Sequence, residues 1–240
     1  MNVYETRAMK SLLEGKTYTG RGIVAGTDAS GSCGVCAYFI MGRSTNSRNR
    51  VFVKDEGRIY TEAFDPSLLK DPSLIIYNAV LEFGRKLIVT NGDQTDTIKE
   101  GFEKGLSFKR SLESRCFEPD GPNFTPRISA VLDFSEEGFS YEMSILKSID
   151  EEGSDCARYT FSYPSKAGLG HFIHTYIDDG EPLPTFTGEP ERTLIPEDID
   201  AFTEEIWEGL DKDNRISLYV RYTSLADGTV TERLINKNRR

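Results

Sequence analysis

Two apolar segments meet at a tight turn in the stretch Ile128-Ser-Ala-Val-Leu-Asp-Phe-Ser-Glu-Glu-Gly-Phe-Ser-Tyr-Glu-Met-Ser-Ile-Leu146. Both segments are rich in residues that favour strands, and Gly138 supplies the backbone freedom that a hairpin turn needs. The stretch therefore predicts antiparallel strands at 128–134 and 139–146. Neighbouring strands with no helix between them favour an α+β fold over alternating strand and helix units.

Nine further runs are predicted as strands because they hold β-branched and aromatic residues and are bounded by Gly, Asn, Asp or Pro. The run at 74–83 follows Pro72 and is almost continuously apolar, as expected for a strand covered on both faces. No G-x-G-x-x-G motif is present, which disfavours a Rossmann dinucleotide site. With the hairpin above, the nine runs bring the expected total to about ten strands. They lie at 21–26, 35–41, 51–53, 74–83, 87–90, 157–163, 172–177, 216–222 and 229–235.

Two helical segments are predicted. In the first, apolar residues recur at a spacing of four from Ile98 to Leu106, and the pattern continues or restarts through Leu112. The second follows Pro196 and extends to Leu210, with an apolar face opposite an acidic, solvated one. The Pro-rich stretch 182–196 is expected to be a connector, so residues 1–240 are expected to form one domain.

The composition excludes several classes of protein. The chain has 240 residues, of which 38% are hydrophobic and 28% charged, so it can bury a core and is not intrinsically disordered. No run approaches the ~18 apolar residues that cross a membrane. The first sixteen residues carry charge throughout and lack an apolar signal core. We therefore expect a cytoplasmic protein with no membrane partner.

The charge is unevenly distributed. The formal net charge is −10, but 178–213 alone holds thirteen acids against Arg192 and Lys212, so the rest of the chain is nearly neutral. An acidic protein is a poor general binder of nucleic acid. The stretch 42–50 holds Arg43, Arg48 and Arg50 among short polar residues and no acid. It is a solvated loop or, because guanidinium forks suit phosphate, a site for a small anion such as a phosphate monoester.

Two other stretches offer groups for proton transfer. Tyr77 interrupts an apolar strand and is either a core tyrosine or a site residue. Glu118, Asp120 and Arg127 crowd a Pro-rich loop, which is either an ion-paired turn or a rigid, partly desolvated carrier of a carboxyl. Asn91-Gly92-Asp93 alone indicates only a turn or a helix start.

Metal and thiol chemistry find little support. Cys33 and Cys36 lead into a strand, and a redox C-x-x-C should open a helix, so ordinary buried cysteines are expected. Cys116 and Cys156 stand alone in the sequence. His171 and His174, three apart in a strand, should point to opposite faces and so cannot both hold one metal. We expect neither a metal nor a cofactor.

An ordered set of short stretches resembles the archaeal-type IMP cyclohydrolase family over roughly residues 18–177. The stretches are Tyr18-Thr-Gly-Arg21-Gly-Ile, Gly42-Arg-Ser44 with Asn49-Arg50, Ile76-Tyr77-Asn78, Asn91-Gly-Asp-Gln-Thr-Asp-Thr-Ile98, Glu118-Pro-Asp120 with Thr125-Pro-Arg-Ile128, and Thr175-Tyr176.

The resemblance implies a four-layer αββα sandwich similar to the N-terminal nucleophile hydrolases. In those hydrolases residue 1 of the first strand is catalytic, whereas here residues 1–17 precede it as an extension. A nucleophile paired with its own amine is therefore not expected. The implied reaction closes the purine ring of 5-formamidoimidazole-4-carboxamide ribonucleotide to IMP with loss of water. It requires no metal.

The resemblance also implies roles for individual residues. Arg43 would stabilise the formyl oxygen or orient the carboxamide, Tyr77 would transfer a proton at the developing hydroxyl, and Glu118 would accept the carboxamide proton or hold the base. The phosphate, ribose and pocket contacts would come from Arg21, Ser44, Asn49, Arg50, Asn91, Gly92, Arg127, Thr175 and Tyr176. The family implies a homo-oligomer, for which the acidic helix is a possible interface.

Two alternatives stay open at this point, because a fold does not fix a function. One is a nucleotide-binding protein that keeps the pocket without turnover. The other is a related cyclic-amide hydrolase acting on another nucleotide. A structural or interaction protein would leave the arginine cluster unexplained.

Overall fold

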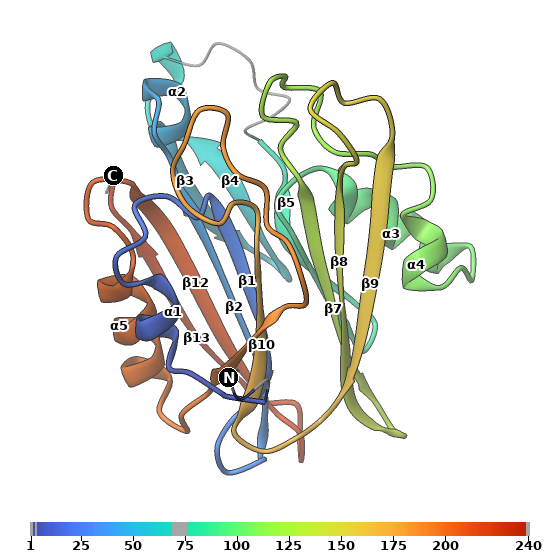
Figure 1. Cartoon of the computed structure of the whole chain (residues 1–240). Helices are drawn as coiled ribbons and strands as arrows, with labels where there is room; N and C mark the ends of the chain where they lie inside the picture. The colour runs from blue at the N-terminus through green and yellow to red at the C-terminus, as the bar shows by residue number, and fades with distance from the viewer. Residues whose placement is uncertain (1, 3, 69–75, 239–240) are drawn as a thin grey trace.

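The computed structural model describes residues 2, 4–68 and 76–238, and within them the chain forms two antiparallel sheets (Figure 1). The first sheet has the strand order β11-β10-β1-β2-β12-β13. Its strands are β1 (Arg21–Thr27), β2 (Cys33–Met41), β10 (Leu169–His174), β11 (Glu191–Leu194), β12 (Arg215–Ser224) and β13 (Val230–Asn236). The second sheet follows chain order, with β3 (Arg50–Asp55), β4 (Arg58–Ala63), β5 (Asn78–Phe83), β6 (Lys86–Thr90), β7 (Arg127–Ser135), β8 (Gly138–Ser148) and β9 (Cys156–Pro164).

The two sheets share a core between them. Ile23 and Tyr38 of the first sheet pack in the same buried cluster as Val89, Ala130 and Met143 of the second. Alternate residues of each strand point into this cluster because side chains in a strand alternate between the faces of a sheet. The outer faces are thus left for helices to cover.

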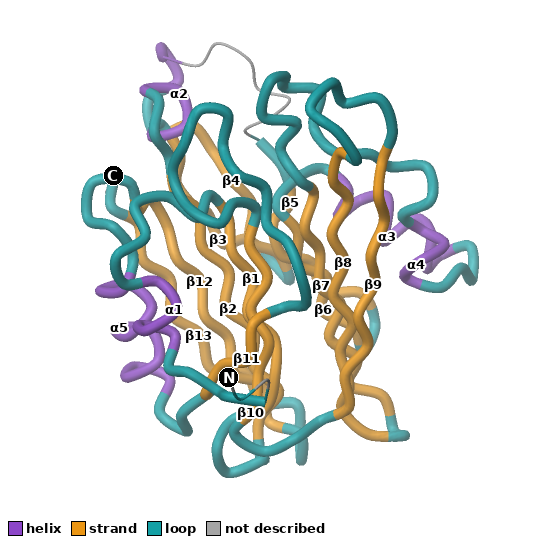
Figure 2. The backbone as a smooth tube through the Cα atoms, viewed as in Figure 1, coloured by secondary structure: helices purple, strands orange, loops and turns teal. Residues whose placement is uncertain are grey.

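Different helices cover the two outer faces (Figure 2). On the first sheet, α1 (Met9–Leu13) and α5 (Ile199–Gly209) bury Leu12, Leu13, Phe202 and Ile206. On the second sheet lie α3 (Gln94–Glu103) and α4 (Phe108–Ser111), while the short α2 (Thr45–Arg48) and the 3-10 turn Pro66–Leu68 belong to the loops around β3 and β4. Two antiparallel sheets with a few helices confirm the α+β class.

The hairpin at 128–146 is confirmed. Strands β7 and β8 pair from Arg127 opposite Leu146 to Ser135 opposite Gly138. Gly138 has φ 117°, a value that only glycine adopts without strain. The second predicted helix is confirmed as α5, which Asp198 caps by accepting from the backbone of Asp200 and Ala201.

Several elements differ from the sequence prediction. Strands β4 and β11 were not predicted, because β4 turns only Ile59, Thr61 and Ala63 inward and β11 has four residues. Helix α3 ends at Glu103, short of Leu106, because Gly105 takes a left-handed φ of 74°. Of the strand predicted at 74–83, residues 74 and 75 lie outside the described residues and β5 begins at Asn78.

The segment before β1 is part of the packed structure. Met9, Leu12 and Leu13 of α1 pack in one cluster with residues of α5, and the Arg7 backbone bridges to Thr193 in β11. Asp178 accepts hydrogen bonds from the backbone of Thr17 at 2.8 Å and Tyr18 at 3.3 Å. The segment therefore holds Tyr18 close to residues 176–178. None of the described helices is long and apolar enough to cross a membrane.

Candidate active site

A cavity of about 290 Å³ opens near α2, where loops from both sheets meet. Its volume is at the lower end of the range for small-molecule sites. We call it the arginine cavity, and it is lined by Tyr18, Arg21, Arg43, Ser44, Asn46, Ser47, Arg50, Glu118, Asp120, Asn123, Thr125, Tyr176 and Leu183. Six of the twelve residues that the resemblance implies are in this lining: Arg21, Arg43, Ser44, Arg50, Glu118 and Tyr176.

Arg50 is the most buried cation at the cavity. Only 1% of it is exposed, and it is the first residue of β3. Its Nε donates to the Ser47 carbonyl at 2.8 Å and its Nη2 to the Met41 carbonyl at 3.0 Å. Burial lowers the pKa of Arg50, and the nearby charge of Arg21 lowers it further. An anion in the cavity would relieve both effects.

Arg21 begins β1 and is half-buried. Its Nε is buried and has no hydrogen-bond partner among the described residues. Burial lowers the pKa of Arg21, but Tyr18 and Glu118 raise it more, so the net pKa is raised and the group stays charged. A buried donor without a partner is costly, and here it points to an absent ligand.

Glu118 is a buried carboxyl in the same lining. It is 4% exposed, and its backbone N–H donates to the Thr125 carbonyl at 2.9 Å. Burial raises the pKa of Glu118, although Arg21 and Arg127 act in the opposite direction. A carboxyl whose pKa is raised toward neutrality is suited to accept and return a proton.

Arg43 lies at the mouth of the cavity. Its Nη1 donates to Asp179 at 2.5 Å and to the Gly180 carbonyl at 3.0 Å, and its guanidinium is 5.2 Å from the Tyr18 ring centroid. Tyr18 in turn stacks on Tyr176 with centroids 5.9 Å apart. This arrangement ties the acidic stretch after residue 177 to the cavity.

Ser44 caps the first turn of α2. Its Oγ accepts from the Ser47 backbone at 3.1 Å and donates to the Ser47 hydroxyl at 3.0 Å. The capping box fixes the start of the loop at 42–50 locally, and Arg48 Nη2 ties the loop to Asn214 at 2.8 Å. The short polar residues of this stretch therefore shape the loop as well as line the cavity.

Tyr77 is 6% exposed and lies behind the cavity lining. Its hydroxyl is 2.8 Å from that of Tyr38, a buried residue of β2. Tyr77 is among the groups that act on the Arg21 guanidinium, so the phenol lies close to it. Tyr77 is thus both a core tyrosine and a neighbour of the site.

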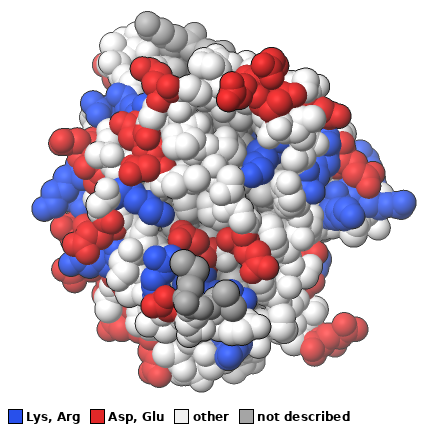
Figure 3. Space-filling model, in the orientation of Figure 1, with Lys and Arg blue, Asp and Glu red and all other residues white. Residues whose placement is uncertain are grey.

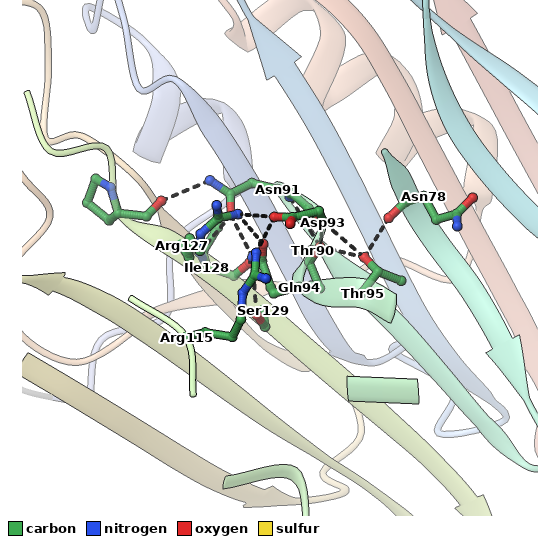
Figure 4. A network of polar contacts seen from close by, with 12 residues as sticks. Asn78, Thr90, Asn91, Asp93, Gln94, Thr95, Arg115, Arg127, Ile128 and Ser129 are labelled. Atoms are coloured by element: carbon green, nitrogen blue, oxygen red, sulfur yellow. Dashed lines mark hydrogen bonds and ion pairs between the residues drawn. The ribbon is translucent and has the colours of Figure 1, made fainter. Parts of the chain in front are cut away.

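Asn91 and Arg127 belong to a buried polar network (Figure 4), in which the Gly92 carbonyl accepts from Thr90 Oγ1 at 2.7 Å. Asn91 accepts from the Ile128 backbone at 2.9 Å and donates to the Pro126 carbonyl at 2.9 Å. Arg127 Nη1 donates to Asp93 at 2.7 Å and to Gln94 at 2.9 Å. A Cβ on Gly92 would lie 2.5 Å from Arg127 Nη1 and 2.7 Å from Gln94 Oε1, so the ends of both side chains would have to shift. The network fixes Arg127, whose charge acts on Glu118.

Asn49 and Thr175 also bond within the protein. The Asn49 amide donates to the Asp65 carbonyl and accepts from the Asp65 backbone, both at 2.7 Å. Thr175 Oγ1 donates to the Thr19 carbonyl at 3.1 Å and accepts from the Arg21 backbone at 3.1 Å. Strand β10 ends at His174, so Thr175 and Tyr176 leave the sheet and turn toward β1.

Seven lining residues were not assigned from the sequence: Tyr18, Asn46, Ser47, Asp120, Asn123, Thr125 and Leu183. Tyr18, Asp120 and Thr125 do lie within stretches that carry the resemblance. Leu183 lies in the connector, and its backbone donates to the Asn123 side chain at 3.0 Å. No local sequence pattern predicts the hydrogen bond between Leu183 and Asn123.

The histidines point to opposite faces, as expected. His171 Nδ1 is 2.7 Å from the Tyr141 hydroxyl, whereas His174 Nδ1 is 2.7 Å from the Tyr176 carbonyl. Burial lowers the pKa of both imidazoles, for His171 to about 4. No group of three or more His, Cys, Asp and Glu side chains suited to a metal is found in the described part of the chain.

The cysteines are all free. Cys36 is buried, as expected, and Cys33 is partly buried. Cys116 and Cys156, far apart in the sequence, are neighbours in the structure. Burial and a hydrogen bond with Cys116 raise the pKa of Cys156 to about 11.

A larger cavity, about 830 Å³, lies around the turn after β5, the β7–β8 turn and the segment after β12. Its main cations are already paired: Arg221 with Glu82, and Arg85 with Glu136 at 3.1 Å. Charges of both signs are likewise interspersed over the face in Figure 3. The size of this larger cavity is a weaker indication of a ligand than the buried Arg21 Nε of the arginine cavity, which has no partner among the described residues.

An α+β protein with three guanidiniums and a buried carboxyl in one small cavity is suited to a small anionic ligand. The model of the family described as IMP cyclohydrolase-like protein matches residues 18–228 of this chain. The chain therefore belongs to the IMP cyclohydrolase-like family. The curated IMP cyclohydrolase of Methanopyrus kandleri is 33% identical over 120 residues, which are 48% of this chain and 59% of that protein. The match thus spans less than two thirds of the relative.

Proposed function

We propose that the protein is an IMP cyclohydrolase that closes 5-formamidoimidazole-4-carboxamide ribonucleotide to IMP and releases water. The observation that carries this proposal is the arginine cavity, where Arg21 and Arg50 form no ion pair with a carboxylate of the described residues and Glu118 is buried beside them. Membership of the family and the name of the curated relative support it.

The cations bind the anionic end of the substrate. Arg50 and Arg21 come from different sheets, so their guanidiniums present donors from two directions to phosphate or ribose oxygens. Ser44 lies in the same lining. Holding the ribonucleotide at this end orients its two reacting groups, which belong to one molecule. Positioning can therefore supply much of the rate.

Glu118 and Arg43 act on the reacting groups. The carboxamide nitrogen attacks the formyl carbon, so it must lose a proton, which the ionised Glu118 accepts. Negative charge develops on the formyl oxygen, and Arg43 stabilises it. This oxygen takes up one proton to become a hydroxyl and a second as it leaves as water, while the formamide nitrogen loses its hydrogen and forms the C=N bond of the ring.

Tyr77 serves the proton transfer at the developing hydroxyl. Its bond to Tyr38 supports a short relay, because Tyr38 can return a proton to Tyr77. Tyr176 lines the base end of the pocket. The other five residues support the cavity lining instead of contacting the substrate, because each forms hydrogen bonds or packs closely within the protein. They are Asn49, Asn91, Gly92, Arg127 and Thr175.

The same proposal includes the finer properties that the resemblance implies. These are an architecture similar to the N-terminal nucleophile hydrolases, one domain over 1–240, a homo-oligomer, a cytoplasmic location and turnover without metal or cofactor. The helices on both outer sheet faces support the first of these.

A direct assay tests the function. The purified protein is incubated with the formamido ribonucleotide in the presence of a chelator, and IMP is followed by chromatography against a control without enzyme. Formation of IMP that depends on the wild-type protein and is lost in Glu118→Gln supports the proposal. Tight binding of IMP without turnover would instead identify a nucleotide-binding protein.

A further inference from the structure

Three polar side chains form a chain along one wall of the arginine cavity. The Thr125 backbone N–H donates to Asp120 Oδ1 at 2.7 Å, and Thr125 Oγ1 is 2.5 Å from Asp120 Oδ2. The Tyr176 hydroxyl is 2.5 Å from the same Thr125 Oγ1. Thr125 and Tyr176 are buried, and all three residues line the cavity.

The direction of these hydrogen bonds follows from the chemistry of the groups. A carboxylate only accepts, so the single hydroxyl hydrogen of Thr125 must lie toward Asp120. Thr125 Oγ1 is then left with lone pairs, and the hydrogen between it and Tyr176 must belong to the phenol. Burial raises the pKa of Tyr176, so the phenol keeps this hydrogen at neutral pH. The Tyr176 oxygen therefore offers only lone pairs to the cavity.

We infer that Asp120, acting through Thr125, makes Tyr176 a pure hydrogen-bond acceptor and so selects ligands that present an N–H group to it. Asp120 is a positioning residue, because it acts on the ligand through two hydroxyls. The choice of donor rests on the proposed function: the carboxamide of the substrate and the ring N–H of IMP are groups of this kind. A ligand with a lone pair at this point would face the Tyr176 lone pairs and be repelled.

Replacement of Asp120 by asparagine should reverse the chain. The Thr125 backbone N–H keeps the amide oxygen on its side, so the amide NH₂ faces Thr125 Oγ1 and donates to it. Thr125 then donates to Tyr176, and the phenol hydrogen turns into the cavity. Thr125→Ser keeps the original direction and is the matched control.

A test without ligand examines the direction itself. Tyrosines are labelled with ¹³C at Cζ, whose NMR shift responds to the hydrogen bonding of the phenol, and the Tyr176 signal is the one missing from Tyr176→Phe. We expect this signal to move in Asp120→Asn and in Thr125→Val, and to stay in place in Thr125→Ser. An unchanged signal in a folded Asp120→Asn protein would overturn the inference.

A binding test examines the selection. Because a misdirected hydrogen bond leaves a buried polar group unsatisfied, Asp120→Asn should weaken IMP binding roughly tenfold or more. In a Tyr176→Phe background the same change should no longer weaken IMP binding. Inorganic phosphate, which has no N–H, should bind Asp120→Asn at least as tightly as the wild type, because the change removes a negative charge from the cavity wall. Equal IMP affinity of the two proteins would refute the selection.

The outcomes separate the two proposals. If the wild type binds no IMP, the proposed function fails, and the NMR test still decides the direction of the chain. If the chain reverses but IMP affinity is unchanged, Tyr176 does not select the ligand, and only the ligand-selecting part of the inference is lost.

Discussion

Burial and the neighbouring Arg21 guanidinium lower the pKa of Arg50, and neither guanidinium forms an ion pair with a carboxylate of the described residues. These two neighbouring cations face one buried carboxyl, that of Glu118, and a bound anion would stabilise the pair further. The arrangement is therefore informative about what the cavity binds.

We expect IMP to raise the melting temperature of the protein through this pair. At a ligand concentration of 100 Kd, binding should add about 2.7 kcal/mol to the free energy of unfolding. Arg50→Met should weaken IMP binding at least roughly tenfold, the cost of a charge-assisted hydrogen bond. Arg58→Met, which removes an exposed partner of Asp55, is the control and should leave binding unchanged. Thermal denaturation with and without IMP measures both effects.

The Tyr38–Tyr77 pair allows the structural and the chemical role of Tyr77 to be separated. Tyr77→Phe and Tyr38→Phe each leave one buried hydroxyl without its partner, at a cost of about 1–3 kcal/mol in the free energy of unfolding. We expect kcat to fall about 100-fold in Tyr77→Phe and much less in Tyr38→Phe. Equal values of kcat in the two variants would show that Tyr77 has only a structural role.

Glu118 should make stability depend on pH with a defined sign. Burial raises the pKa of Glu118 in the folded protein above its unfolded value, so the folded state holds the proton more tightly. Its stabilising contribution is therefore complete at low pH and is lost as the pH rises through the folded pKa. Between the unfolded and the folded pKa, the wild type loses this contribution and Glu118→Gln does not, so the variant gains stability relative to the wild type. Above the folded pKa the difference should stay constant. Urea unfolding at several pH values measures the difference.

Glu118 should also govern activity. The ionised form accepts the carboxamide proton, so kcat/KM should fall on the acid side with a midpoint above that of an ordinary glutamate. Glu118→Gln should reduce kcat by roughly 100-fold or more. A variant that keeps both full kcat and the acid limb would remove Glu118 from the mechanism.

Gly153 should affect the cavity from a distance. It has φ 71°, and a Cβ there would lie 2.5 Å from the ring of Phe124, which precedes Thr125 and itself has φ 42°. Gly153→Ala should cost about 1–2 kcal/mol of stability from the backbone alone and should also displace this loop. IMP affinity should therefore fall.

Gly84→Ala is the matched control for this prediction. Gly84 also has a left-handed φ, 57°, but a Cβ there would meet nothing within 4 Å. It should lose similar stability while keeping full affinity for IMP. Loss of affinity in both variants would mean that destabilisation alone is responsible.

The sequence predicted elements whose signals are local. The strands β7 and β8 and their turn at Gly138 follow from residue type and spacing, as does the apolar face of α5. Strand β4 was not predicted because its inward residues include the polar Thr61. The Thr61 hydroxyl accepts a hydrogen bond from the Tyr77 backbone instead of packing in an apolar run.

The candidate site was predictable only in part, for a physical reason. The resemblance brought together residues from distant stretches, and Arg21, Arg50, Glu118 and Tyr176 do line one cavity. It did not distinguish them from Asn49, whose side chain holds Asp65. An asparagine that binds backbone and one that binds ligand look alike in sequence, because tertiary contacts decide which partner is within reach.

The position of the two cations at strand starts has a consequence for motion. Arg21 opens β1 in one sheet and Arg50 opens β3 in the other, so an anion held between them ties the sheets at one end of their shared core. Fluctuations that spread the sheets apart must break this tie first. Amide protons of β1 and β3 should thus exchange more slowly with solvent when the cavity is occupied. The ligand concentration would then set how often the two sheets separate.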